Sequence, residues 1–361
     1  MKKALGLLSL FALLAGCVTW TEDSQGNLKS FGVPGVPVWT AKEPPKTPES
    51  GNSATTGPPP LDPQTAELTI GGDGRGIWLN ELNRWREMSG VQPVGENTDL
   101  TKGSLAHARY LVKQGPSGSE SFVAYTDEMG AAGHTEDATS QWYSPEGAEA
   151  ASGGKRAYGV FQAADVSFGK SEAEDIQLWL VSPFHRFSLL SPSVSVAGYG
   201  AFGDYPQRAA ALALRGVTQQ GTDAELVEFP PEGASFAIAT MDAREWPNPL
   251  TSCPGYSPPV GLPISLQMGR QIKLQSYSLR DITKDRAVEA CAFDAATYEN
   301  SDLVAERRAR ETLKIYGAIV LIPRHALVPG HHYRVEVKTL RHTVNWSFAI
   351  AAERQKYASG Q

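Results

Sequence analysis

Three histidines in the middle of the chain are the residues best suited to chemistry: His107, His134 and His185. A neutral imidazole is a common ligand of Zn²⁺, and an imidazole also exchanges protons near neutral pH. Their spacing fits no local metal motif, because the chain contains neither His-Glu-x-x-His nor Cys-x-x-Cys. A site that uses more than one of them must therefore be assembled by the fold.

Each histidine also has a purely structural interpretation. His107 is flanked by apolar helical positions, which favours a packing role or a supporting role behind other site residues. His134 would otherwise be a loop residue, and His185 follows a helix end, where an imidazole can bind free carbonyl groups. For these two we favour a place in a binding site. We expect Glu136 to be solvated, and His331–His332 to form a turn rather than a metal site.

The helices that would carry these residues follow from hydrophobic periodicity. Apolar residues at helical spacing predict one helix around Trp78–Trp85. A second helix is predicted over Thr98–Gln114, where Leu105, Ala108 and Val112 would form the inward stripe.

Further along the first region, a third helix and two strands are predicted. Ser171–Val181 has helical spacing and is broken by Pro183. Gly115–Gly133 is rich in glycine and serine and predicts a loop. Ser193–Gly200 and Ala209–Val217 predict strands.

Beyond about residue 224 the pattern changes to strict alternation. Apolar and polar residues alternate over Leu262–Leu266, Tyr333–Val337 and Trp346–Ile350, which is typical of sheets with one buried face. Short strands separated by Pro/Gly turns predict a β-sandwich. The charged segment Glu299–Glu311 would be a loop or a short exposed helix.

Several short motifs follow one another in the first region. They are His107-Ala-Arg-Tyr, Gly-His134-Thr, Ser-Pro-Glu146-Gly-Ala, Trp179-x-x-Ser-Pro-x-His185-Arg and Gly198-Tyr-Gly. Their order resembles bacterial members of the CAP superfamily, which includes cysteine-rich secretory proteins, antigen 5 and pathogenesis-related 1. The resemblance implies an α+β fold, with an α-β-α sandwich and a central cleft over residues 72–221.

The resemblance also implies a set of site residues. In the family, two histidines and two acidic residues line the cleft, and some members bind a divalent cation there. His134 and His185 match the two histidine positions. The first acidic motif is altered here, with Glu149 as a stand-in and Glu146 as a weaker one. The second acidic position has no clear match, and Ser182 would occupy it, so Zn²⁺ binding is implied only through an incomplete set of ligands.

The C-terminal region carries a second resemblance. Ile322-Pro323-x-x-x-Leu327-x-Pro329-Gly330-x-x-Tyr333, followed by Trp346-x-Phe348, resembles immunoglobulin-like domains of bacterial surface proteins. It implies an all-β immunoglobulin-like sandwich over residues 222–352, with a spacer or adhesion role and a flexible tail over 353–361.

The N-terminus carries an export signal. A basic start and an apolar run end in Leu14-Ala15-Gly16-Cys17, which resembles the lipobox of bacterial lipoproteins. The resemblance implies cleavage before Cys17, a lipid on its thiol, and attachment to the outer membrane. The alternative is an ordinary secretory signal with a chance cysteine. Residues 18–71, crowded with proline, predict a semi-rigid linker without regular structure.

The two other cysteines, Cys253 and Cys291, would form a disulfide outside the cytoplasm. The alternative is two unrelated buried thiols. A bridge would stabilise the fold by roughly 3–4 kcal/mol in the chain-entropy model.

Three functions are compatible with these features. The net charge of −6 without a basic block disfavours nucleic acid binding. We favour a non-catalytic cell-envelope protein, on the periplasmic face or the cell surface, that binds a lipid, sterol-like or glycan ligand. The alternatives are a metal-assisted hydrolase acting on peptides or wall material, and a structural or adhesive protein with a vestigial cleft. The absence of Gly-x-Ser-x-Gly weakens the hydrolase.

Overall fold

The computed structural model describes the main folded part of the chain and three short strands near its N-terminus. The described residues are 19–22, 28–32, 39–40, 76–117, 121–122, 129–153, 160–217, 226–242, 245–270 and 272–352. The predicted signal peptide with Cys17, and the predicted tail over 353–361, lie outside them. Residues Met1–Leu68 and Thr69–Gln361 form two separate compact units.

The N-terminal unit contains a small antiparallel sheet, which differs from the linker without regular structure expected there. Its strand order is β1-β2-β3, with β1 at Thr19–Glu22, β2 at Leu28–Gly32 and β3 at Trp39–Thr40. None of the three strands contains proline, and Pro34 and Pro37 fall between β2 and β3. Because these prolines lie between the strands, they remove no hydrogen bond of the sheet. A proline-rich segment can therefore form strands from its proline-free stretches.

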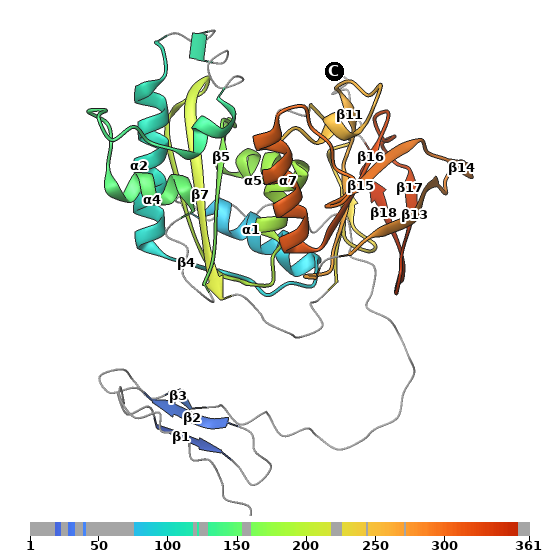
Figure 1. Ribbon diagram of the computed structural model, residues 1–361, viewed down its shortest axis with the longest axis horizontal. Coiled ribbons are helices and arrows are strands. Elements are labelled where there is room, and N and C mark those ends of the chain that lie inside the picture. Colours follow the sequence, from blue (N-terminus) through green and yellow to red (C-terminus); the bar gives the residue numbers. More distant parts are fainter. Residues whose placement is uncertain are drawn as a thin grey trace, which may run out of the picture. The chain divides into compact units, whose positions relative to one another are not determined.

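The first folded region, residues 76–217, is built in three layers (Figure 1). Its sheet has the order β4-β6-β7-β5, with β4–β6 parallel and the other pairs antiparallel. The strands are β4 (Gly95–Glu96), β5 (Val160–Ser167), β6 (Val194–Asp204) and β7 (Gln207–Val217). Helices α2 (Thr98–Gln114) and α4 (Pro145–Ser152) pack on one side, and α1 (Ile77–Met88) and α5 (Glu172–Val181) on the other. The predicted α-β-α arrangement is confirmed.

The helices begin where side chains can cap them. Asn97 accepts hydrogen bonds from the amides of Asp99 and Leu100 at the start of α2, and Ser171 caps α5 through Glu174. After α5 the chain continues into α6 (Pro183–Leu189), because proline fits the first turn of a helix, where its missing N–H is not needed. The predictions for Thr98–Gln114 and Ser171–Val181 are confirmed.

Of the inward stripe predicted for α2, Ala108 is buried and Val112 is half-buried as expected, but the prediction for Leu105 was wrong. Leu105 is 45% exposed, whereas His107, Ala108 and Leu111 are buried. A Cβ on Gly200 of β6 would overlap the backbone of α2, so the helix lies directly on the strand there. Because the backbones of α2 and β6 are so close at this point, no space remains between them for the Leu105 side chain.

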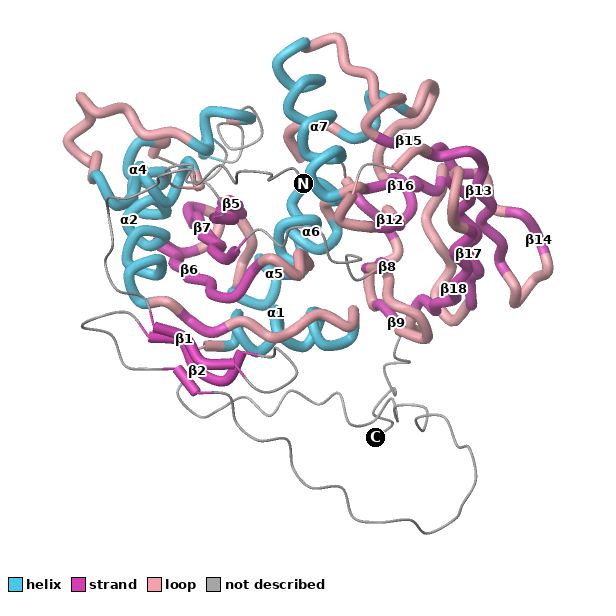
Figure 2. The backbone as a smooth tube through the Cα atoms, turned by 60° about the horizontal axis from the view of Figure 1, so that its bottom comes forward, coloured by secondary structure: helices cyan, strands magenta, loops and turns pink. Residues whose placement is uncertain are grey.

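The C-terminal region, residues 226–352, contains two larger sheets (Figure 2). One has the order β15-β16-β12-β8 and the other β14-β13-β17-β18-β9, with β9 and β18 parallel. Their strands are β8 (Val227–Phe229), β9 (Ser235–Phe236), β12 (Ile264–Gln267), β13 (Leu274–Asp281), β14 (Arg286–Ala287), β15 (Ala290–Asp294), β16 (Ala318–Pro323), β17 (His332–Thr339) and β18 (Thr343–Ile350). Its shorter elements are η3 (Pro249–Ser252), β10 (Thr240–Met241) and β11 (Val260–Gly261), whereas η2 (Gly130–His134) belongs to the first folded region.

Two predictions for this region need correction. The alternation predicted one solvated face for the strand at residues 262–266, but Ser265 and Gln267 of β12 are also buried, because α6 covers that face. For the charged segment at 299–311 the helix alternative holds from residue 303, but α7 (Leu303–Tyr316), capped by Asp302, is longer than expected and buries Ala305, Ala309 and Leu313. In contrast, the alternation in β17 is confirmed, since Tyr333, Val335 and Val337 are buried.

The first folded region and the C-terminal region share one hydrophobic core. Trp85 of α1 packs edge-on against Phe236 at 4.8 Å and contacts Phe229 at 6.0 Å between ring centroids. Phe184 of α6 lies against Phe293 and Tyr298. Aromatic contacts of this kind add about 0.5–1.5 kcal/mol each beyond area burial, so they bind the two regions firmly. The predicted division between residues 221 and 222 stays a prediction.

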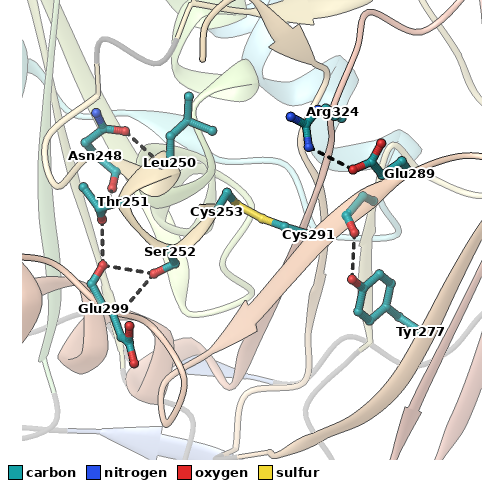
Figure 3. The surroundings of a disulfide bond; sticks show 11 residues. Asn248, Leu250, Thr251, Ser252, Cys253, Tyr277, Glu289, Cys291, Glu299 and Arg324 are labelled. Atoms are coloured by element: carbon teal, nitrogen blue, oxygen red, sulfur yellow. Dashed lines mark hydrogen bonds and ion pairs between the residues drawn. A yellow bond between two sulfur atoms is a disulfide. The ribbon is translucent and has the colours of Figure 1, made fainter. Parts of the chain in front are cut away.

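The disulfide between Cys253 and Cys291 is confirmed (Figure 3). It ties the turn after η3 to β15 across 38 positions of sequence. The hydroxyl of Thr251 donates to the carbonyl of Glu299 beside it, which fixes the same turn a second time. Among the described residues, no helix is both long enough and apolar enough to cross a membrane.

Candidate functional site

His107 of α2 is fully buried and both of its ring nitrogens face oxygen acceptors. Nε2 lies 2.8 Å from the carbonyl oxygen of Gly133, and Nδ1 lies 2.9 Å from Oε1 of Glu136. The Gly133 carbonyl only accepts, so Nε2 must carry a hydrogen and donate it. The second contact needs another hydrogen between Nδ1 of His107 and Oε1 of Glu136. This pair fixes the turn that ends in His134, in agreement with the predicted supporting role of His107.

The expectation that Glu136 is solvated was wrong, because its carboxylate is completely buried. Its Oε2 accepts from the amide of Ser144, and its Oε1 lies where a Cβ on Gly147 would be, 2.5 Å away. Only glycine at position 147 leaves room for this carboxylate. At the altered acidic motif around Gly147, the carboxylate of Glu136 therefore occupies the space that a side chain at position 147 would take.

The two glutamates named from the sequence lie elsewhere. Glu149 of α4 is 52% exposed in its side chain and pairs with Arg215 of β7 at 3.5 Å. Glu146 is exposed in the first turn of α4. Neither is brought to His134 or His185 by a described contact.

His134 and His185 are brought within electrostatic range of each other. His134 ends η2, and its imidazole is held by a hydrogen bond to the backbone of Ala151. Burial, assisted by His107, lowers the pKa of His134 to about 4. Burial and the nearby His134 lower the pKa of His185 to about 3. Both imidazoles are therefore neutral at physiological pH, with lone pairs free to accept a proton or bind a metal.

Glu245, in the C-terminal region, supplies a carboxyl group that sequence reasoning missed. Its Oε1 accepts from the backbone amide of His185 at 2.8 Å and lies 3.3 Å from Nδ1 of the same residue. The backbone of Phe184 also donates to it. Burial is the main reason that the pKa of Glu245 rises to about 8. Ser182, the position expected to replace the missing acid, directly precedes α6, and the carboxyl group of Glu245 accepts from an amide in the first turn of that helix.

A second buried carboxyl group comes from β5. Asp165 is 3% exposed and accepts a hydrogen bond from the hydroxyl of Ser188 at 2.8 Å. Burial raises the pKa of Asp165 to about 7, and the charge of Arg308 on α7 counteracts that rise. The alternation of residues along β5 is a weak sequence signal that Asp165 points inward. How deeply Asp165 is buried depends on the helices that pack around it.

We define the buried polar cluster as His134, Asp165, His185 and Glu245, of which the two carboxylic acids are buried and the two histidines are half-buried. Two of its atoms have no hydrogen-bond partner: Oε2 of Glu245, and Nδ1 of His185, whose 3.3 Å approach to Oε1 of Glu245 lacks hydrogen-bond geometry. Buried polar atoms without partners are rare and mark places where water, an ion or a ligand completes the bonding. No group of three or more His, Cys, Asp or Glu residues with a metal-binding arrangement occurs in the part of the chain described. Within that part, the donors present do not form a complete Zn²⁺ site.

Comparison with known families agrees with this geometry. The model of the Cysteine-rich secretory protein family, CAP, matches residues 79–212. This stretch is a CAP domain. No curated protein matches the chain. The CAP domain contributes His134, Asp165 and His185, whereas Glu245 lies beyond the match. Together with the disulfide, the CAP domain indicates an extracytoplasmic protein.

The buried polar cluster predicts a pH dependence of stability that Glu245→Gln should remove in part. The folded state keeps the Glu245 proton up to about pH 8, whereas the unfolded chain releases it near 4.5, so rising pH in that window destabilises the fold. The lowered pKa values of His134 and His185 act oppositely, but only below about 6.5. From pH 6.5 to 8 the wild type should therefore lose roughly 2 kcal/mol more than Glu245→Gln.

Urea unfolding at pH 5, 6.5 and 8 measures this difference. Glu311→Gln, on the exposed face of α7, is the control and should follow the wild type at every pH. Parallel stability curves for wild type and Glu245→Gln would show that the proton is not held in the folded state.

Proposed function

We propose that this chain is a lipid-anchored protein of the bacterial outer membrane whose CAP domain binds a lipid or glycan ligand at the buried polar cluster. The observation that carries the binding role is the pair of unpartnered buried atoms, Nδ1 of His185 and Oε2 of Glu245. Each would cost about 1–3 kcal/mol if it stayed unsatisfied, so a ligand or an ordered water that bonds them is favoured. The C-terminal region, proposed to be immunoglobulin-like, would support the site and act as a spacer.

A binding role is favoured over metal-assisted hydrolysis by the state of Glu245. At neutral pH both imidazoles are neutral, but Glu245 holds its proton, and a carboxyl group must lose its proton before it can bind a metal. Imidazoles with pKa values of about 3 and 4 are also weak bases, whereas they can still hydrogen-bond a ligand.

Native mass spectrometry of gently purified protein tests the binding role. We expect an additional bound mass on the wild type, and at least a tenfold lower occupancy in His134→Gln/His185→Gln, which keeps most of the side-chain volume. His332→Ala, at an exposed position, is the matched control and should retain the ligand. A bound metal at one equivalent would instead support the hydrolase. No bound species on any variant would favour the structural or adhesive role.

The lipid anchor is tested separately by Cys17→Ser. Removing the thiol removes the attachment point of the acyl chains, each buried CH₂ of which contributes about 0.8 kcal/mol of membrane affinity. We expect the variant to leave the membrane fraction for the soluble fraction, with an unchanged fold by circular dichroism. Retention of Cys17→Ser in the outer membrane after a high-salt wash would show that the anchor lies elsewhere.

A further inference from the structure

One side of α2 presents exposed residues of mixed character at helical spacing. Leu105, Arg109 and Lys113 stand four positions apart, which places them in one row along the helix. All three side chains are exposed, including the aliphatic Leu105. The row therefore follows the solvent side of α2, which forms an outer layer of the first folded region (Figure 1).

Two aromatic rings hold the cations of this row in place. The guanidinium carbon of Arg109 lies 5.5 Å from the ring centre of Trp142, and Nζ of Lys113 lies 5.6 Å from the same ring. Nζ of Lys113 is also 5.6 Å from the ring centre of Phe202 on β6. Both rings are half-buried, and the faces of such rings attract cations at these distances. The two positive charges are thus gathered around a single indole.

No carboxylate neutralises these two charges. Neither Arg109 nor Lys113 has a side-chain hydrogen bond or an ion pair within the described part of the chain, whereas Lys102 on the same helix pairs with Asp99 at 3.2 Å. Asp137, on the loop that carries Trp142, instead accepts from the amide and the hydroxyl of Thr139. Because two neighbouring cations repel each other, an anion that lies against both is favoured.

We propose that a basic–aromatic surface, made of Leu105, Arg109, Lys113, Trp142 and Phe202, docks onto the anionic headgroups of a lipid membrane. The cations would bind the phosphate groups, while the aliphatic and aromatic side chains enter the boundary between headgroups and acyl chains. This mixture of side chains favours a membrane over a free anion, because a free anion has no use for an exposed leucine. The chain as a whole carries a net charge of −6, so the attraction is confined to this surface.

The inference rests on the proposed lipid anchor, which would keep a membrane within reach of a weak site. None of the five residues belongs to the buried polar cluster. Docking would therefore leave the cluster available to its own ligand.

A fluorescent label at position 105 tests the docking in the lipidated full chain. Cys17 would carry the lipid, and Cys253 and Cys291 are bridged, so Leu105→Cys introduces a single free thiol for an environment-sensitive dye. Leu340→Cys, at a residue that is 72% exposed between β17 and β18, is the matched control. The chain is reconstituted on phosphatidylcholine vesicles with and without phosphatidylglycerol. We expect the emission at position 105 to shift to the blue only with phosphatidylglycerol, and the emission at position 340 to stay unchanged.

Two double variants, each made in the labelled chain, test the cations. We expect Arg109→Gln/Lys113→Gln to lower the ratio of docked to undocked chain by about 25-fold, roughly fivefold for each cation near an anionic surface. Arg307→Gln/Lys314→Gln removes the same charge from exposed positions of α7 and should leave the ratio unchanged. Salt at about 0.5 M should reverse the shift, because it screens charges at a surface.

The outcomes separate this inference from the proposed function. Equal emission at position 105 on the two kinds of vesicle, or equal effects of the two double variants, would overturn the docking surface. Displacement by glucuronate or inorganic phosphate, but not by sodium chloride of the same ionic strength, would reassign the cations to a soluble anion and overturn it too. Failure of the chain to float with pure phosphatidylcholine vesicles would count against the lipid anchor alone, and the phosphatidylglycerol vesicles would still decide the docking.

Discussion

Arg186→Met is expected to lower the free energy of unfolding by about 3–5 kcal/mol, the largest effect of any single substitution considered for this chain. Arg186 is completely buried at the contact of α6 with the C-terminal region. Its guanidinium donates to the carbonyls of Leu180 and Val181 and to the hydroxyl of Ser265. Methionine has a similar length but no donor, so three buried acceptors would lose their partner.

The contact also carries packing energy. The guanidinium carbon of Arg186 lies 4.0 Å from the centre of the Phe229 ring, and burial lowers the pKa of Arg186 to about 9, so the group remains charged at neutral pH. A desolvated cation over an aromatic ring contributes on the order of 2 kcal/mol. Replacing a buried charge by an apolar residue can leave stability unchanged when its hydrogen-bond partners find other donors. Here the partners are the last carbonyls of α5, which lie inside the core and would lose the Arg186 donors.

Thermal and urea unfolding measure the effect. For a unit of this size, we expect the melting temperature of Arg186→Met to fall by roughly 10 °C in one transition. Arg307→Met, the same substitution on the exposed face of α7, should change stability by less than about 0.5 kcal/mol. A melting temperature of Arg186→Met within 2 °C of wild type (about 1 kcal/mol or less) would show that the buried hydrogen bonds are replaceable.

Loss of the disulfide is expected to cost about 4 kcal/mol. The bridge closes a segment of 38 positions, for which the loss of loop entropy in the unfolded chain gives this figure. Cys253 is 2% exposed, so reduction also leaves a buried thiol beside η3. Because Glu245 precedes η3 by only a few residues, the same change should loosen its contact with His185.

Cys253→Ser/Cys291→Ser, unfolded in urea beside the oxidised wild type, measures this effect. We expect a lower urea midpoint and weaker ligand retention in the double variant. Cys17→Ser leaves the bridge intact and is the control. An unchanged midpoint after full reduction, verified by thiol counting, would mean that the contacts of Thr251 and Tyr298 with their neighbours hold the turn without the bridge.

The C-terminal region emerges as part of the candidate site rather than as a passive attachment. It supplies Glu245 against the start of α6, and β12 and α7 pack on α6 as well. Removal of this region would expose Arg186 and Phe184, so truncation at the end of the CAP match is expected to give an aggregation-prone fragment. Function and stability therefore depend on the same contact.

The sequence alone determined the elements whose signals are local. Apolar periodicity, with the break at Pro183, placed α2 and α5 within one residue of their ends. The order of short motifs predicted the CAP domain, and two cysteines in an exported chain predicted the bridge. The helices depend on residues that are close in the chain and repeat with the period of a helix. The bridge follows because only two cysteines remain to pair with each other.

The tertiary structure alone decided which acidic groups surround the histidines. Glu136 takes its place because Gly147 leaves room for it, and Glu245 reaches His185 across 60 positions of sequence. The raised pKa values of Asp165 and Glu245 come from burial by elements far away in the chain. Desolvation and the close approach of two groups depend on distances in space, which the spacing of residues along a chain does not encode.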